Sequence, residues 1–264
     1  MIGLILSEWL KTKRTMVRWI TFLLPVLFSI AIVSYFILRG ESENFQMEAY
    51  QTFFEAWSIV ILPIGVSVLA GYMIHEEELA GSFNGFLSVN IPRYKLFLGK
   101  IVPLILIIVI STLLALITFY IGMGIVFPGA LNFGLLFLFA ACLVIFGTLP
   151  LIAIHIWISF AWGMGASIGV GIVGLLMAAL VGGTSLGNSI WPFIPWAWPV
   201  RLTKNLSPYL TFTADMVAPP SFISSGWTIQ QFLIGISSTG ICLIIVLIGG
   251  IVWFNLWEGR KYYE

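Results

Sequence analysis

The sequence predicts an all-α membrane protein with six transmembrane helices. Of its 264 residues, 60% are hydrophobic and only 9% are charged, whereas soluble domains average about 45–50% apolar and about 25% charged residues. The mean hydropathy is +1.06. Six apolar runs reach about 20 residues, the length that a membrane-spanning helix needs.

The first expected element is an interfacial helix over residues 1–18. In "IGLILSEWLKTKR" (2–14) the apolar residues follow helical spacing on one face, and the polar residues fall on the other. These polar residues are Ser7, Glu8, Lys11 and Arg14. The pattern suits a helix at the cytoplasmic surface with basic residues near anionic lipid. A basic N-terminus that only sets the topology explains the segment equally well.

The chain is expected to form one transmembrane domain. Its six spans are expected at 19–38, 55–74, 100–127, 131–160, 164–182 and 230–257. Pro150 lies within the long fourth run, so we expect a kink or a tilt there. In the glycine-rich fifth run, Gly165 and Gly169 form a G-x-x-x-G pattern. This pattern predicts close helix packing, either within the chain or between chains.

The distribution of basic residues predicts that both termini are cytoplasmic. The residues expected on that side are Lys11, Lys13, Arg14, Arg18, Arg93, Lys95, Lys100, Arg260 and Lys261. Those expected on the other side are Arg39, Arg201 and Lys204. The carboxylates of Glu41, Glu43 and Glu48 then face outward.

The outer connection, residues 183–229, is expected to form short broken helices at the membrane surface. Its motif "WPFIPWAWPVR" (191–201) crowds Trp191, Trp196 and Trp198 among prolines. Proline interrupts regular helices, and tryptophan favours the membrane–water boundary. The three tryptophans are interpreted either as interfacial anchors or as an outer surface that contacts substrate.

Several functional classes lack support in the sequence. The chain has no G-x-x-x-x-G-K-[ST] motif, and "GVGIVG" (169–174) has no preceding strand to make it a dinucleotide site. The two cysteines lie in apolar runs, and no Cys/His cluster predicts a metal site. The net charge of +1 does not indicate a nucleic-acid partner. No nucleophile–base pair predicts catalysis.

His155 is the only ionisable residue near the centre of a run. A titratable group in a membrane is a functional candidate by default. A neutral histidine that hydrogen-bonds a neighbouring helix is the favoured interpretation.

The stretch "EEELAGSFNGFLSVNIPRYKLFLGK" (76–100) gathers charge between the second and third runs. Phe83, Phe86 and Leu87 recur at i, i+3 and i+4, which predicts a very short amphipathic helix. Gly81 precedes it and Pro92 follows it. We expect a short, rigid helical turn that displays apolar and charged surface to a soluble partner.

This stretch resembles the loop between spans two and three of ABC-2 type transporter permeases. The matching residues, in order, are Glu76, Glu77, Glu78, Gly81, Ser82, Leu87, Ser88, Pro92, Arg93, Gly99 and Lys100. The sequence departs from the family in "FLS", where "LLS" is commoner, and in the length of "VNIPR".

The resemblance implies that this loop is a coupling helix, seated in a groove of a separate ATP-binding subunit. Its ATPase-coupling residues would be Glu76, Glu77, Glu78, Gly81, Ser82, Phe83, Phe86, Leu87, Pro92 and Arg93. Two permease subunits, identical or related, would pair with two ATPases. ATP and Mg²⁺ would bind the ATPase, and this chain would hold no cofactor.

Within that family the chain looks like a lantibiotic immunity permease, closer to the G type than to the E type. The resemblance rests on "GSFNGFLS" (81–88), "YQTFFEAW" (50–57) and "IPWAWPVR" (194–201). It implies expulsion of lantibiotic peptides from the membrane of a Gram-positive cell. Glu41, Glu43 and Glu48 would attract such a cationic peptide, and Trp191, Trp196 and Trp198 would contact its apolar side.

Two alternatives remain open. The same fold would serve a drug, an ion or a lipid-linked precursor as cargo. A membrane scaffold or sensor without transport would need no ATPase.

Overall fold

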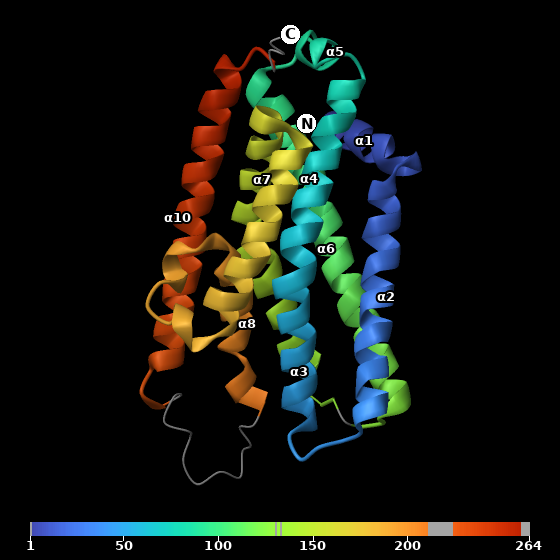
Figure 1. Cartoon of the computed structure of the whole chain (residues 1–264), viewed down its shortest axis with the longest axis vertical. Coiled ribbons are helices and arrows are strands. Elements are labelled where there is room, and N and C mark those ends of the chain that lie inside the picture. Colours follow the sequence, from blue (N-terminus) through green and yellow to red (C-terminus); the bar gives the residue numbers. More distant parts are fainter. Residues whose placement is uncertain (1, 130, 133, 211–223, 260–264) are drawn as a thin grey trace.

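The computed structural model describes residues 2–129, 131–132, 134–210 and 224–259, and within these it contains helices and no strand. The all-α class is therefore confirmed. Among the described residues, five helices are long and apolar enough to cross a membrane: Met16–Arg39, Phe45–Leu79, Arg93–Val126, Gly134–Gly183 and Trp227–Leu256. They run along the long axis of the molecule (Figure 1).

The helices follow one another with few long connections. The first part of the chain forms α1 (Ile2–Lys11), the 3-10 turn η1 (Thr12–Arg14), α2 (Met16–Arg39), α3 (Phe45–Ala56), the π-helical segment η2 (Trp57–Ile61), α4 (Leu62–Leu79), α5 (Asn84–Leu87) and α6 (Arg93–Val126). The rest forms α7 (Gly134–Met177), the π-helical segment η3 (Ala178–Gly183), α8 (Trp198–Lys204) and α10 (Trp227–Leu256). Helices α3, η2 and α4 form one continuous rod.

Helix α7 consists of two arms that meet at Gly163. The φ of 88° and ψ of 179° at Gly163 lie outside the helical region, and glycine accepts them because it has no Cβ. His155 Nδ1 lies 3.0 Å from Ser167 Oγ, 12 positions along the chain, a separation of about 18 Å in a straight helix. The arms therefore fold back on each other. Pro150, where we expected a kink or a tilt, keeps helical φ and ψ angles.

The first arm of α7 covers residues 134–160 of the expected span 131–160, and the second arm together with η3 covers the expected span 164–182. Helix α6 begins at Arg93 instead of residue 100, and α3 carries the second expected span back to Phe45. Among the described residues, five helices are long and apolar enough to cross a membrane, and one of them folds back on itself at Gly163. The number of membrane crossings therefore stays a prediction.

Helix α4 packs against α7 where small residues permit a close approach. A Cβ on Gly71 would lie 2.9 Å from Met164 Cγ, and a Cβ on Gly171 would overlap the side chain of Ser67. Such close contacts are typical of helix packing in membranes, where van der Waals contacts hold helices together.

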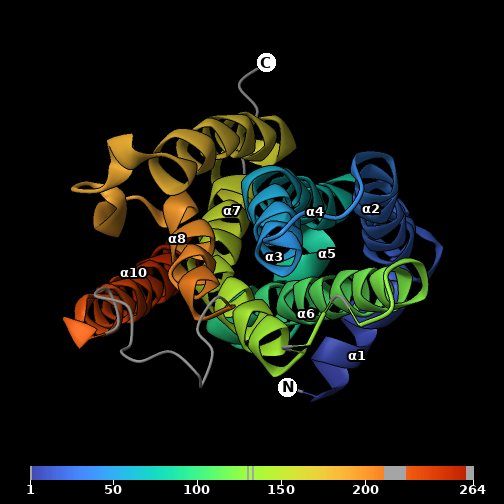
Figure 2. The same cartoon turned by 90° about the horizontal axis from the view of Figure 1, so that it is seen from below.

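The two ends of the bundle differ. At one end, the loop end, lie α1 and α5; toward the other, the cap end, residues 184–210 form a cap segment (Figures 1 and 2). The cap segment comprises the 3-10 turns η4 (Ser185–Gly187), η5 (Trp191–Phe193), η6 (Pro195–Ala197) and η7 (Ser207–Leu210), together with α8. The rest of the expected outer connection at 211–223, and the basic pair Arg260 and Lys261, lie outside the described residues.

Two cations attach the cap segment to the end of α7–η3. Arg201 Nη2 donates to the carbonyls of Val181 at 2.8 Å and Thr184 at 2.6 Å. Lys204 Nζ donates to the carbonyl of Gly183 at 2.7 Å. The last carbonyls of a helix have no partner within the helix, so these side chains satisfy them.

Candidate functional site

The loop between α4 and α6 turns sharply before its single helical turn. Gly81, Ser82 and Phe83 have φ values of 129°, 51° and 67°, all in the left-handed region. Glycine accepts such angles readily, but a bulky residue such as phenylalanine adopts them only when its surroundings hold it there. Helix α5 then spans only Asn84–Leu87.

The apolar side of this loop packs onto the protein itself. Phe83 is 2% exposed, and its ring lies 5.0 Å from that of Trp257 in an edge-on contact. Phe86 is half-buried and stacks on Phe160 at 6.0 Å. The prediction that Phe83 is displayed to a partner is wrong, because the left-handed turn directs its ring into the core.

The outward side of the loop is mostly polar. Its exposed residues are Ala80, Gly81, Ser82, Asn84, Gly85, Ser88, Val89, Asn90 and Pro92. Val89 is the large apolar side chain among them, at 44% exposure. A soluble partner that binds this loop would therefore meet hydroxyl, amide and backbone groups around Val89, with exposed Leu79 and Tyr94 at the two flanks.

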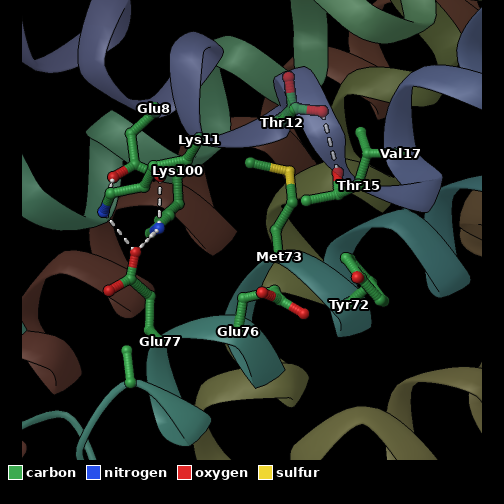
Figure 3. A pocket seen from close by; sticks show the side chains of 11 residues that line it. Glu8, Lys11, Thr12, Thr15, Val17, Tyr72, Met73, Glu76, Glu77 and Lys100 are labelled. Atoms are coloured by element: carbon green, nitrogen blue, oxygen red, sulfur yellow. Dashed lines mark hydrogen bonds and ion pairs between the residues drawn. The ribbon is translucent and has the colours of Figure 1, made fainter.

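Four charged residues form the ion cluster beside the loop: Glu8, Glu77 and Lys100 are buried, and Lys11 lies at its exposed edge. Lys100 of α6 is 2% exposed and contacts the carboxylates of Glu8 and Glu77, the latter at 2.5 Å. Lys11 lies 2.7 Å from Glu8 and 2.6 Å from Glu77. Figure 3 shows the two ammonium groups converging on the carboxylate of Glu77. Two positive and two negative charges balance in the cluster.

The ion cluster joins α1 to both flanks of the loop. Glu77 lies near the end of α4 and Lys100 in the second turn of α6, whereas Glu8 and Lys11 belong to α1. For Lys11, burial acts to lower the pKa, but the ion pairs with Glu77 and Glu8 outweigh it and raise the pKa above 10.5.

Helix α1 directs Glu8 of its polar face toward the bundle, while Ser7 and Lys11 of that face stay exposed. Glu8 is buried, while Leu6 and Leu10 are 56% and 60% exposed. Glu8 pairs with Lys100 inside the protein, whereas the side chain of Lys11, one of the basic residues expected near anionic lipid, is 54% exposed. The exposed leucines suit contact with the apolar side of the interface. The sequence pattern gives the two faces of α1 but not the partner of each.

The remaining charged loop residues take different positions. Glu76 is exposed, and Glu78 lies 3.3 Å from His75. Arg93 donates to the carbonyl of Trp257, just after the end of α10. Arg93 therefore ties the start of α6 to the C-terminal helix.

A pocket of about 340 Å³ opens between α1, η1 and α4 (Figure 3). Its lining residues are Glu8, Lys11, Thr12, Thr15, Val17, Tyr72, Met73, Glu76, Glu77, Ala80 and Lys100. The pocket lies directly against the ion cluster, so this corner of the loop end combines charge, hydroxyl groups and open volume.

The tryptophans of the cap segment are mostly internal. Trp191 and Trp198 are each 2% exposed and pack with Val181 and Ala197. The cap segment folds both rings inward, so neither lies at the surface, where the sequence placed them as interfacial anchors or as a substrate contact. Trp196 is half-buried, and its Nε1 is buried without a hydrogen-bond partner among the described residues.

The three outer carboxylates are not equivalent. Glu41 and Glu43 are exposed. Glu48 lies 3.0 Å from Arg39 and accepts a hydrogen bond from Ser42 at 2.8 Å. Its charge is therefore largely neutralised within the protein.

The G-x-x-x-G pattern does not pack within the chain. A Cβ on Gly165 or Gly169 would meet no atom within 4 Å. The glycines that permit close approach in this arm are Gly171 and Gly174, whose added Cβ atoms would overlap Ser67 and Trp196. The within-chain form of the packing prediction is wrong for Gly165 and Gly169, because they lie on an exposed face of the arm.

His155 forms the expected hydrogen bond to a neighbouring helical arm. Its Nδ1 lies 3.0 Å from Ser167 Oγ, and that hydroxyl donates to the carbonyl of Ser67 at 2.9 Å. The hydroxyl proton is thus committed, so the histidine donates from Nδ1. The chain of hydrogen bonds links both arms of α7 to α4.

The long apolar helices define a multi-pass membrane protein, and its loop between α4 and α6 is packed onto the bundle. Residues 4–185 match the family model described as ABC-2 family transporter protein. This is more than half of the 264 residues, and the chain belongs to that family. No curated protein sequence and no solved structure shows significant similarity to it. Membership makes the chain a membrane component of a transporter, and it implies an ABC ATPase partner and pairing of permeases.

Proposed function

We propose that the chain is the permease subunit of an ABC exporter, with six membrane crossings and both termini in the cytoplasm. The sixth crossing comes from counting the two arms of α7 separately. The loop end then faces the cytoplasm, where its ATPase partner binds ATP and Mg²⁺. The cap end faces outward.

The observation that carries this proposal is the attachment of the loop between α4 and α6. Its underside is fixed by Phe83 and Phe86 against the aromatic cluster of Phe160 and Trp257. Its flanks are fixed to α1 by the ion cluster. Its outward side stays exposed. A flexible connection between two spans would need neither set of contacts.

These contacts define how force would pass from the ATPase to the permease. Closure of the ATPase on ATP pushes or pulls the exposed side of the loop. Because the loop packs on α7 and α10 and is tied to α1, α4 and α6, these helices move with it. Packed interiors transmit displacement since they have few voids.

The cargo that the sequence favours is a lantibiotic-type peptide, which makes the chain an immunity permease, of G type, in a Gram-positive cell. Glu41 and Glu43, exposed toward the cap end, support the attraction of a cationic peptide. Attraction between exposed charges weakens with salt. Neutralising Glu41, Glu43 and Glu48 together should reduce protection against the peptide at low salt, and unchanged protection would count against this cargo.

The coupling proposal is tested by co-purification of the ATPase with tagged permease. The variant Asn84→Asp/Val89→Glu changes two exposed loop residues and should abolish co-purification without lowering the melting temperature. Leu186→Glu, a change of an exposed residue in the cap segment, is the control and should leave co-purification intact. An ATPase that stays bound to the loop variant would refute docking at this surface.

A further inference from the structure

A seam of polar contacts joins α3 to the cap segment. Tyr50 Oη donates to the carbonyl of Thr203 at 2.9 Å, and Gln51 Nε2 donates to Ser207 Oγ at 3.2 Å. One turn further along α3, Glu55 Oε1 lies 3.7 Å from Lys204 Nζ. The polar residues Gln51, Glu55 and Ser58 follow spacings of four and three, so they share one face of the helix.

Glu55 is the least satisfied member of this seam. Lys204 Nζ donates to the carbonyl of Gly183, not to Glu55. At 3.7 Å the Glu55–Lys204 pair is an ion pair without a hydrogen bond. No donor of the described residues lies within hydrogen-bond distance of the Glu55 carboxylate, which is 37% exposed at its side chain. A carboxylate has about four acceptor positions, and those of Glu55 are open.

Two neighbouring polar side chains also lack partners. Ser58 Oγ and Asn205 Nδ2 are buried without a hydrogen-bond partner among the described residues. Ser58 is 1% exposed and Asn205 is 8% exposed. Leaving such groups unsatisfied is unfavourable. The Ser58 hydroxyl can accept a hydrogen bond from a cationic group, whereas the Asn205 amide nitrogen is itself a donor and cannot receive one.

The backbone around Glu55 is irregular on both sides of the seam. The π-helical segment η2 begins at Trp57, two residues after Glu55. It adjoins the second π-helical segment η3, since a Cβ on Gly183 would lie 3.3 Å from Ile59 Cδ1. Single π-helical turns are rare and occur frequently at functional sites.

In the proposed orientation, Glu55 lies near the outer boundary of the membrane. Glu55 precedes Glu76 by 21 positions (76 − 55), which is about 32 Å of helix. The hydrocarbon core of a bilayer is about 30 Å thick. With Glu76 at the inner boundary, the carboxylate of Glu55 therefore lies where the outer leaflet meets water.

We infer that the carboxylate of Glu55 receives a cationic group of the cargo, an ammonium or a guanidinium, at the outer boundary of the membrane. This inference rests on the proposed export of a cationic amphipathic peptide. The incoming cation donates hydrogen bonds to Glu55, and Lys204 keeps its bond to Gly183. No proton or covalent bond is exchanged in this step.

The test measures binding of two probes to the purified permease–ATPase complex in lipid nanodiscs. One probe is a synthetic amphipathic peptide with several lysines, and the other is the same peptide with its lysines acetylated. A charge-assisted hydrogen bond should make the lysine peptide bind about tenfold more tightly than the acetylated one. Glu55→Gln should bring the two affinities to within about twofold. Glu258→Gln, an exposed charge change near the loop end, should keep the tenfold preference.

A charge swap separates ligand binding from a structural role. Glu55→Lys/Lys204→Glu keeps opposite charges across the seam but gives up the bond from Lys204 to the Gly183 carbonyl, so its melting temperature should fall no further than that of Lys204→Met, which loses the same bond. Its preference for the lysine peptide should stay lost, because the receiving position is now cationic. A swap variant that recovers the preference, or a Glu55→Gln variant that keeps it, would overturn the inference. If the parent complex itself shows no preference, the cationic cargo is wrong, and this inference is overturned with it.

Discussion

Replacing Lys100 by methionine removes the cation at the centre of the ion cluster and keeps an unbranched side chain. Lys100 is 2% exposed and contacts both Glu8 and Glu77. The variant changes the net charge of the cluster from zero to −1, with two carboxylates and one ammonium remaining. Removing one partner of a buried ion pair costs about 3–5 kcal/mol. We expect a loss near 3 kcal/mol, because Lys11 still contacts both carboxylates.

Lys11→Met is the matched control, because Lys11 contacts the same two carboxylates. Its side chain is 54% exposed, and water and salt screen such a pair. Exposed ion pairs contribute about 0–1 kcal/mol. The two lysine variants should therefore differ by at least about 2 kcal/mol, which is more than tenfold in the folding equilibrium.

A second substitution restores the charge balance. In Lys100→Met/Glu8→Gln one carboxylate and one ammonium remain, so the double variant should recover part of the lost stability. Unfolding by SDS titration, followed by tryptophan fluorescence, gives the free energies for this cycle. The reasoning is refuted if Lys11→Met costs as much as Lys100→Met, or if Glu8→Gln makes the Lys100 variant less stable still.

Three further predictions concern packing and pH. Phe83→Ala should lower stability by about 3–5 kcal/mol, since its ring is buried, whereas the exposed Val89→Ala should leave the same unfolding titration unchanged. Gly174→Ala should lower the melting temperature because its Cβ would overlap Trp196, whereas Gly169→Ala meets no atom and should not. The pKa of Lys11 is raised in the folded protein, so its stabilising contribution should be fully present below pH 10.5 and be lost as pH rises through the folded pKa. The free energies of unfolding of the parent and of Lys11→Met, measured by the same titration, should therefore become equal only in that alkaline range.

Composition and hydropathy predict the helical membrane class, because a bilayer requires long apolar segments with internally bonded backbone. The loop motif predicts the turn after α4 and the short helix α5. The inward direction of Phe83 is not predictable in the same way. A four-residue helix shows only one turn of periodicity, and the left-handed angles at Ser82 and Phe83 decide which side faces the core.

The pairing of Glu8, Glu77 and Lys100 in the ion cluster could not be predicted from the sequence, for a different reason. Glu8, Glu77 and Lys100 lie far apart in the sequence, and each charge has a plausible position at the membrane surface. Their burial depends on α1 docking against α6. Similarly, tryptophan favours the membrane boundary in general, but Trp191 and Trp198 find a more favourable position inside the cap segment.

The glycines of the second arm of α7 also show that a sequence pattern does not identify which residues contact a neighbour. Gly165 and Gly169 follow a recognised spacing and lie on an exposed face, while Gly171 and Gly174 lie against Ser67 and Trp196. Spacing identifies a face on which a neighbour fits. Which face the neighbour occupies follows from the reversal at Gly163, and the reversal depends on one residue whose conformation the sequence pattern does not reveal.

The rod of α3, η2 and α4 connects the two sites directly. Glu77 lies near one end of the rod in the ion cluster, and Glu55 lies just before η2. A regular helix transmits displacement along its axis, since each turn is hydrogen-bonded to the next. A π-helical turn carries an extra residue and is the natural place for such a rod to change its pitch. Movement of the loop end would therefore reach the seam through η2, where a change of pitch would rotate Glu55 relative to Lys204 and alter its hold on a bound cation.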